Sequence, residues 1–326
     1  FFNNSLSFSF DWFKKDTKDM LMERPIPLYV GSGSPLSNVG TLTNQGIELE
    51  VGYKLSVDKV NLSFLANASY VKNEIKNLGN QTGYIDKESL PTLGTVSRNQ
   101  NGYPIGYFFG YKAIGVFQTQ EEIDNYISPA TGKPIQPNAV PGDTKFEDLN
   151  GDGVISDDNE DRTMIGKPNP DWMVGLTVAA DWNGFDLSAF FQGSFGADVF
   201  DALRRYELAA VNYTSDALER WTGPGTSNSM PRIVLGDTPK NFRPSTLLVH
   251  DASFLRLRNL QVGYTLPAQL TRKAYIQRLR FYASFDNLLT ITGYKGMDPE
   301  IGSTMGIDKG VYPQARVYTF GLNLTF

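Results

Sequence analysis

The sequence of 326 residues contains no cysteine and a single histidine, His250. Disulfide-stabilised scaffolds and Cys/His metal centres are therefore excluded. The mean hydropathy is -0.29, and no run of about 18 apolar residues occurs, so a transmembrane helix is not expected. Cations are outnumbered by anions, 30 Lys and Arg against 35 Asp and Glu. The resulting net charge of -5 argues against a nucleic-acid partner, because phosphate binding requires a basic surface.

What the chain has instead is a strict alternation of apolar and polar residues. In the terminal stretch from Val317 to Phe326, every second side chain is apolar, as in a β-strand with two different faces. A strand about ten residues long, tilted by roughly 45°, crosses the hydrocarbon layer of a membrane. Since only every second residue of such a strand faces lipid, a negative mean hydropathy is compatible with a membrane barrel. The aromatic content of 13% fits rings placed at the two membrane surfaces.

Similar alternation predicts eight wall strands and an all-β fold, a transmembrane antiparallel β-barrel. The expected strands are Leu6 to Trp12, Ile47 to Leu55, Val60 to Tyr70, Trp172 to Trp182, Phe185 to Phe195, Leu255 to Leu266, Leu279 to Phe285 and Val317 to Phe326. In the sixth strand the phase changes, which predicts one bulged residue near Asn259. Asn183-Gly184 predicts a two-residue hairpin turn.

The connections between these strands alternate in length, short after Leu55, Trp182 and Leu266 and long elsewhere. That asymmetry is typical of outer-membrane barrels, which have tight periplasmic turns and long external loops. We therefore expect two large extracellular loops, at residues 71–170 and 196–247, with ligand or partner contact as their role. Within them we expect a hairpin over Tyr103 to Phe117, and a short helix over Asp201 to Trp221.

Several blocks of sequence resemble the SusC/RagA family of TonB-dependent outer-membrane transporters. The most specific is DASFLRLRNLQVGYTLP, at Asp251 to Pro267. The others, in the order of the family, are NVGTLTNQGIELEVGYK at Asn38 to Lys54, PIGYFFGYKAIGVFQ at Pro104 to Gln118, PGDTKFEDLNGDGVI at Pro141 to Ile155, FDLSAFFQGSFG at Phe185 to Gly196, and the end from Tyr282 through NLLTITGYKGMDPEI to GLNLTF.

The resemblance implies that residues 1–326 are the C-terminal part of a barrel of about 22 strands, the size of plugged outer-membrane transporters, without the plug domain. It implies import of oligosaccharides or peptides across the outer membrane of Bacteroidetes-type bacteria. The implied partners are a SusD-like surface lipoprotein acting as a lid, TonB acting through the missing N-terminal part, and outer-membrane lipid. A dimer of transporter and lipoprotein pairs is implied as well. No catalytic residues and no required cofactor are expected.

A calcium site is predicted in the loop that starts at Asp148, where the sequence DLNGDGVI matches the first half of a D-x-N-x-D-G calcium loop. The ligands would be the side-chain oxygens of Asp148, Asn150 and Asp152 and the carbonyl of Val154. The twelfth position, which should be a bidentate acid, is Asn159. The alternative is a turn in which these side chains bind their own backbone.

Other residues have both a functional and a structural interpretation. Ligand or lid contact is predicted for four rings that could stack on sugars, with packing of the external hairpin as the alternative: Tyr103, Tyr107, Phe108 and Tyr111. Two arginine pairs on adjacent strands predict a cross-strand basic cluster that faces the plug or an anionic ligand: Arg256 with Arg258, and Arg278 with Arg280. The alternative is anchoring to lipid phosphates or internal ion pairing with residues such as Asp286. His250, beside Asp251, is expected to be a hydrogen-bonding loop residue. Paired acids such as Glu121-Glu122 lie in polar loops, where solvated charge is commoner than a glycosidase site.

Two other classes of protein would use the same alternation. A passive porin or small autonomous barrel needs only eight strands, but the long loops disfavour it. A soluble β-sandwich, such as a calcium- or carbohydrate-binding module, would bury its apolar face against a second sheet. The position of Phe320, Leu322 and Leu324 decides between them, since these residues face lipid in a barrel and protein in a sandwich.

Overall fold

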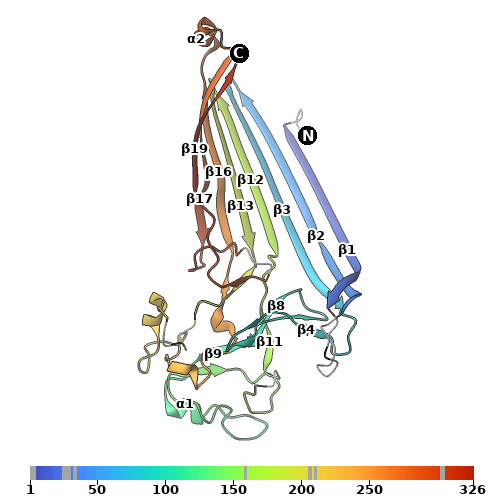
Figure 1. Cartoon of the computed structure of the whole chain (residues 1–326), viewed down its shortest axis with the longest axis vertical. Helices are drawn as coiled ribbons and strands as arrows, with labels where there is room; N and C mark the ends of the chain where they lie inside the picture. The colour runs from blue at the N-terminus through green and yellow to red at the C-terminus, as the bar shows by residue number, and fades with distance from the viewer. Residues whose placement is uncertain are drawn as a thin grey trace.

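The computed structural model describes residues 5–23, 31, 35–157, 160–204, 208, 211–301 and 305–326. Its main feature is one antiparallel sheet of eight strands that follow one another in chain order (Figure 1). These wall strands are β1 (Leu6–Glu23), β2 (Leu36–Val57), β3 (Val60–Asn77), β12 (Trp172–Trp182), β13 (Phe185–Phe195), β16 (Phe254–Thr265), β17 (Arg278–Thr292) and β19 (Val317–Thr325). No helix in the described part of the chain is long and apolar enough to cross a membrane.

Shorter elements lie in the connections between the wall strands. The strands are β4 (Tyr84–Asp86), β5 (Ser89–Leu90), β6 (Gly94–Thr95), β7 (Ser97–Gln100), β8 (Tyr107–Tyr111), β9 (Ala113–Val116), β10 (Thr144–Phe146), β11 (Arg162–Gly166), β14 (Asp198–Asp201), β15 (Val249–Asp251) and β18 (Ile307–Asp308). The helices are α1 (Gln120–Asp124), α2 (Ala268–Thr271), η2 (Ser215–Glu219), η3 (Leu235–Asp237), η4 (Thr246–Leu248) and η5 (Arg272–Ala274).

All eight predicted wall strands are confirmed, and β12 and β13 have the predicted bounds. The predicted bulge is confirmed as well, because the pairing of β13 with β16 shifts by one residue at Arg258. Asn183 and Gly184 both have positive φ, 47° and 87°, as a type I′ hairpin turn requires. The first three strands are longer than predicted, and β3 continues to Asn77, into the expected loop 71–170.

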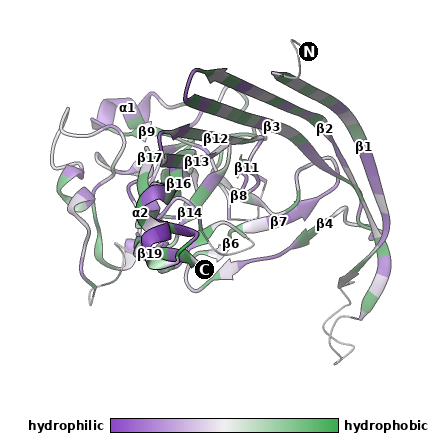
Figure 2. Ribbon diagram, turned by 90° about the horizontal axis from the view of Figure 1, so that it is seen from above, coloured by the Kyte–Doolittle hydropathy of each residue, from purple (hydrophilic) through white to green (hydrophobic). Residues whose placement is uncertain are grey.

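The two faces of the wall differ in polarity, and Figure 2 shows hydrophobic and hydrophilic bands alternating along β1, β2 and β3. Among the residues that the structure describes, no second sheet covers the apolar face. Phe320, Leu322 and Leu324 are 77%, 57% and 41% exposed, and Phe8 and Phe10 are similarly open. In a sandwich these side chains would be buried, so this observation removes the support for the β-sandwich alternative.

Aromatic side chains on the apolar face form two rows, set by the strand register. Trp172 pairs with Tyr70 and Phe195, and Tyr70 continues through Ile47 to Trp12. Ten positions further along β12, Trp182 pairs with Phe185, which continues to Tyr264 and Phe281. The ten residue steps between the rows, at about 3.4 Å per residue and tilted by about 45°, cover about 24 Å, close to the apolar band of about 25 Å found in outer-membrane barrels.

The connections at the two ends of the wall differ strongly. At the end where β19 finishes, β2 joins β3 through two residues and β12 joins β13 through two residues. The link from β16 to β17 has the predicted position, within one residue, and it contains α2 and η5. At the opposite end, residues 78–171, 196–253 and 293–316 connect the strands, and they gather beyond the wall (Figure 1).

One expectation for these long connections is wrong. Residues Tyr103 to Phe117 do not form a hairpin, since β8 pairs with β7 and β11, and β9 pairs with β10. These partners come from other parts of the chain, so the local pattern did not determine the pairing. The short helix expected within Asp201 to Trp221 is present, among the described residues, as the five-residue 3-10 helix η2.

Candidate functional site

The long connections form one packed body at the end of the wall, which we call the loop assembly. A four-stranded sheet of order β11-β8-β7-β4 belongs to the segment 78–171. A second sheet, of order β15-β14-β18, joins the other two connections, because β14 pairs in parallel with β18. The loops are therefore linked by backbone hydrogen bonds as well as by side chains.

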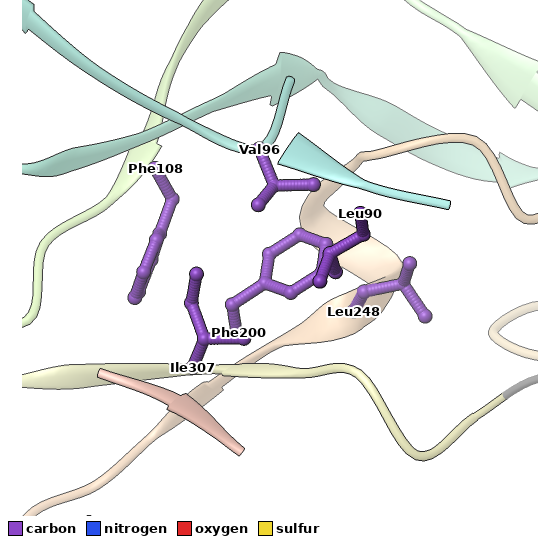
Figure 3. Packing of buried hydrophobic residues seen from close by; sticks show 6 residues of the cluster. All are labelled: Leu90, Val96, Phe108, Phe200, Leu248 and Ile307. Atoms are coloured by element: carbon purple, nitrogen blue, oxygen red, sulfur yellow. The ribbon is translucent and has the colours of Figure 1, made fainter. Parts of the chain in front are cut away.

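A hydrophobic core holds the loop assembly together, and Figure 3 shows its six buried members around the ring of Phe200. Phe200 is fully buried, and its ring centroid lies 5.9 Å from that of Phe108. All three long connections contribute to the cluster, which consists of Leu90, Val96, Phe108, Phe200, Leu248 and Ile307. The assembly thus has a core separate from the apolar face of the wall.

Three of the four rings predicted to contact a ligand lie inside this body. Tyr107, Phe108 and Tyr111 are buried. Burial raises the pKa of Tyr107 and Tyr111, so both hydroxyls stay protonated and donate, to Oε1 of Gln100 at 2.6 Å and to the carbonyl of Ser156 at 2.7 Å. The packing interpretation describes these three residues. Ligand contact stays a prediction for Tyr103, which is half-buried and stacks on Tyr107 at 5.0 Å.

A stack of alternating rings and guanidinium groups runs through the same region. Two guanidinium groups lie against the ring of Phe109. The Cζ atom of Arg98 is 3.5 Å from the centroid of this ring, and the Cζ atom of Arg162 is 4.3 Å from the same centroid. Such contacts stabilise a buried guanidinium through the ring quadrupole. In order, the stack contains Tyr84, Arg98, Phe109, Arg162, Tyr111, Arg243 and Phe146. The sequence gives no signal for it, because its arginines are widely separated along the chain.

In the predicted calcium loop, the acidic side chains bind backbone N–H groups. Asp148 accepts from Gly151 and Gly153 at 2.8 and 2.9 Å, and Asp152 accepts from Val154 at 2.8 Å. Asn150 donates to Asp152 and to Glu160, while Asn159 lies outside the described residues. Among the residues that the structure describes, no group of three His, Cys, Asp or Glu side chains could hold a metal ion. These contacts fit the turn interpretation, and calcium binding by Asp148, Asn150, Asp152 and Val154 stays a prediction.

That prediction has a direct test, calcium titration of the purified protein by calorimetry. If the loop binds calcium, the titration gives a saturable heat signal, and Asp148→Ala abolishes this signal because the first oxygen ligand is lost. Asp152→Asn is the matched variant, since it keeps an oxygen that can accept from Val154 but removes one charge. It should weaken binding without changing the turn. No heat from the unsubstituted protein would eliminate the calcium site.

The two arginine pairs do not form one basic cluster. Arg256 pairs across the sheet with Thr290, whereas Arg280 pairs with Thr265, so the pairs lie at opposite ends of β16 and β17. Ion pairing is confirmed for three of the four. Arg280 binds Asp186, and the other two bind a shared carboxylate in the 293–316 connection, as described next.

Arg256 and Arg258 anchor the last long connection to the wall. Arg256 is 2% exposed and donates to Asp298 at 2.5 Å and to Glu300 at 2.9 Å, and Arg258 donates to Glu300 at 2.6 Å. Burial raises the pKa of Asp298, but the N–H groups of Gln314 and Glu300 and the guanidinium of Arg256 outweigh it and leave this pKa below its ordinary value. We call Arg256, Arg258, Asp298 and Glu300 the anchor network.

His250 lies in β15 beside a cavity at the wall end of the loop assembly. Its Nε2 atom is buried and has no hydrogen-bond partner among the described residues, and the expected hydrogen-bonding role of His250 stays a prediction. The nearest acid is Asp201, with Oδ2 at 3.8 Å from Nε2. Burial, together with the nearby charge of Arg204, lowers the pKa of His250, which keeps the imidazole neutral at pH 7.

Comparison with known proteins gives consistent results. The family model described as TonB dependent receptor-like, beta-barrel, matches residues 1–288. The chain is 33% identical over 341 residues to TonB-dependent receptor P3 of Formosa agariphila, covering 100% of this chain and 33% of the relative. It is 29% identical over 333 residues to TonB-dependent receptor SusC of Bacteroides thetaiotaomicron, covering 100% of this chain and 31% of the relative.

Among solved structures, the chain is similar to one described as the structure of the RagAB peptide transporter. The TM-score is 0.78 with 28% identity, over 100% of this chain and 34% of that chain. The closed-closed state of the RagAB peptide importer gives a TM-score of 0.76. The chain spans about one third of the length of the curated relatives that it matches.

Proposed function

Because this chain belongs to the TonB dependent receptor-like β-barrel family, we propose that it forms the C-terminal part of the wall of an outer-membrane importer. The activity is TonB-dependent uptake of oligosaccharides or peptides, together with a SusD-like surface lipoprotein that covers the extracellular mouth. The plug and the TonB contact belong to the remainder of the protein. An outer membrane holds no ATP, so concentrating a large ligand requires energy from elsewhere.

One observation carries this proposal, the uncovered apolar band between two aromatic rows. Its height of about 24 Å matches a bilayer-spanning barrel, whereas a soluble module would expose such a band to water. We place the two-residue turns in the periplasm and the loop assembly on the cell surface, since outer-membrane barrels have long external loops. The loop assembly is then the surface on which the lipoprotein lid rests.

Uptake in matched strains tests the proposal. We expect a strain that carries the full-length protein to accumulate its ligand, and expect accumulation to stop when TonB is deleted. The control for expression is a strain whose full-length protein carries a point substitution in this chain that leaves the loop surface unchanged. Accumulation that persists without TonB would revive the passive porin. Purification of the native complex adds a second readout, and absence of a lipoprotein companion would contradict the lid mechanism.

A further inference from the structure

The apolar face of the wall becomes polar immediately beyond the aromatic row that ends at Trp12. The next positions on the same face are Lys14, Gln45 and Lys72, because Lys14 pairs with Gln45 and Gln45 pairs with Lys72. We call these three residues the lysine row, and all three are exposed. Two residue steps along strands tilted by about 45° place the row about 5 Å beyond the aromatic side chains, where the headgroups of a bilayer begin.

The positive charge of the lysine row is only partly balanced by neighbouring acids. The acids of the next row on this face are Asp16 and Glu74. Oδ2 of Asp16 lies 3.7 Å from Nζ of Lys14, whereas Oε1 of Glu74 lies 2.5 Å from Nζ of Lys76. Lys72 has no ion-pair partner in the part of the chain that the structure describes, and Glu74 attracts it only from a longer distance. The row can therefore accept an anion.

The strands that carry the lysine row also extend further beyond the aromatic row than β12 does. β3 pairs with β12 only as far as Tyr70, but it continues to Asn77 with β2 as its partner. At the same rise and tilt, these seven additional residue steps cover about 17 Å. The headgroup layer of a phospholipid bilayer is only about 5–8 Å thick on each side. A polar face of this height matches a lipid with a larger headgroup, such as a phosphorylated sugar.

We propose that Lys14 and Lys72 bind the phosphate of a glycolipid in the outer leaflet of the membrane, and that the amide of Gln45 donates to the same headgroup. The two lysines are separated by one strand, so their Cα atoms are about 10 Å apart, and both flexible side chains can reach one headgroup. Their apolar stems lie along hydrocarbon while the ammonium groups stay among the phosphates. This assignment rests on the proposed importer function, which places the loop end of the wall at the cell surface.

Lipid binding to the delipidated full-length protein in detergent tests the assignment, by native mass spectrometry with three probes. The first is an acylated disaccharide that carries two phosphate monoesters, and the second is the same lipid after enzymatic removal of both phosphates. The third is phosphatidylglycerol. We expect the phosphorylated glycolipid to bind at least about tenfold more tightly than either of the other two. Equal affinity for the dephosphorylated lipid or for phosphatidylglycerol overturns the assignment.

Variants locate the binding. Lys14→Gln and Lys72→Gln should each weaken binding of the phosphorylated glycolipid by about fivefold, and together by about 25-fold, since a lysine near anionic lipid contributes about 1 kcal/mol. Lys15→Gln is the matched control, because Lys15 is also exposed but lies on the opposite face of β1, and it should change nothing.

Unchanged affinity in the double variant contradicts the lipid site. Loss of a dimer in place of lost lipid contradicts it too, because the lysine row would then contact a second copy of the protein. The assay measures no uptake, so TonB-dependent import can persist when the lipid site fails, and lipid binding stays measurable when import fails.

Discussion

Replacing Leu176 by arginine should destabilise the folded wall by about 2–4 kcal/mol, the cost of a charge at the middle of the lipid face of a barrel. Leu176 is 37% exposed and lies between the aromatic rows that contain Trp172 and Trp182. Its cross-strand neighbours are Ala66 and Phe191, so no acid adjoins the new charge. The cost is therefore the removal of a guanidinium from water into hydrocarbon.

The measurement is urea unfolding of the full-length protein in phospholipid vesicles, followed by tryptophan fluorescence. Val57→Arg is the matched control, because Val57 is 55% exposed on the same face but lies at the end of β2, next to the row of Trp182. We expect it to cost only about 0–1 kcal/mol, as at a membrane interface. Equal small costs at both depths would mean that water contacts this face, and the membrane assignment would fail.

The second large effect is expected at Arg256, where Arg256→Ala should cost about 3–5 kcal/mol, the usual result of removing one partner from a buried ion pair. The guanidinium is almost fully buried and holds both Asp298 and Glu300. Without it, the carboxylate of Asp298, whose side chain is 9% exposed, stays buried without its cation. The 293–316 connection should detach from the wall before the wall itself unfolds.

Limited proteolysis of the protein in vesicles distinguishes local detachment from global loss, since cleavage within residues 293–316 reports the first. The control is Arg278→Ala, at the start of β17. Arg278 is exposed and has no ion-pair partner among the described residues, so its removal should reduce the free energy of unfolding by less than about 1 kcal/mol. If Arg256→Ala and Arg278→Ala behave alike, the anchor network contributes nothing to stability.

The wall strands could be predicted from the sequence because a strand with one lipid-facing side needs an apolar side chain at every second position. β12 and β13 were bounded correctly since the alternation begins and ends with their aromatic residues. β1 continues beyond Trp12 through Lys14, Lys15 and Asp16, where the strand has left the apolar band and polar residues are acceptable on both faces. The alternating pattern therefore predicts only the part of β1 that lies within the apolar band, whereas the full length of β1 depends on its backbone pairing with β2.

The loop assembly could not be predicted, because its structure depends on long-range pairing. β8 pairs with β11, which lies more than fifty residues later in the chain. The parallel pairing of β14 with β18 joins two separate connections. The Asp148 turn was recognisable since its residues are adjacent in sequence. The arginine and aromatic stack has no local signature, because its members meet only after folding.

The shared core around Phe200 limits how far one long connection can change without the other two. Leu90, Phe200 and Ile307 come from three different connections, so a new version of one connection must still fill the space left by the other two. Exchange of a single loop between two relatives should give a poorly packed chimera, whereas transfer of all three together should preserve it. Under the proposed importer function, a change of ligand would therefore involve all three connections together, while the wall stays the same.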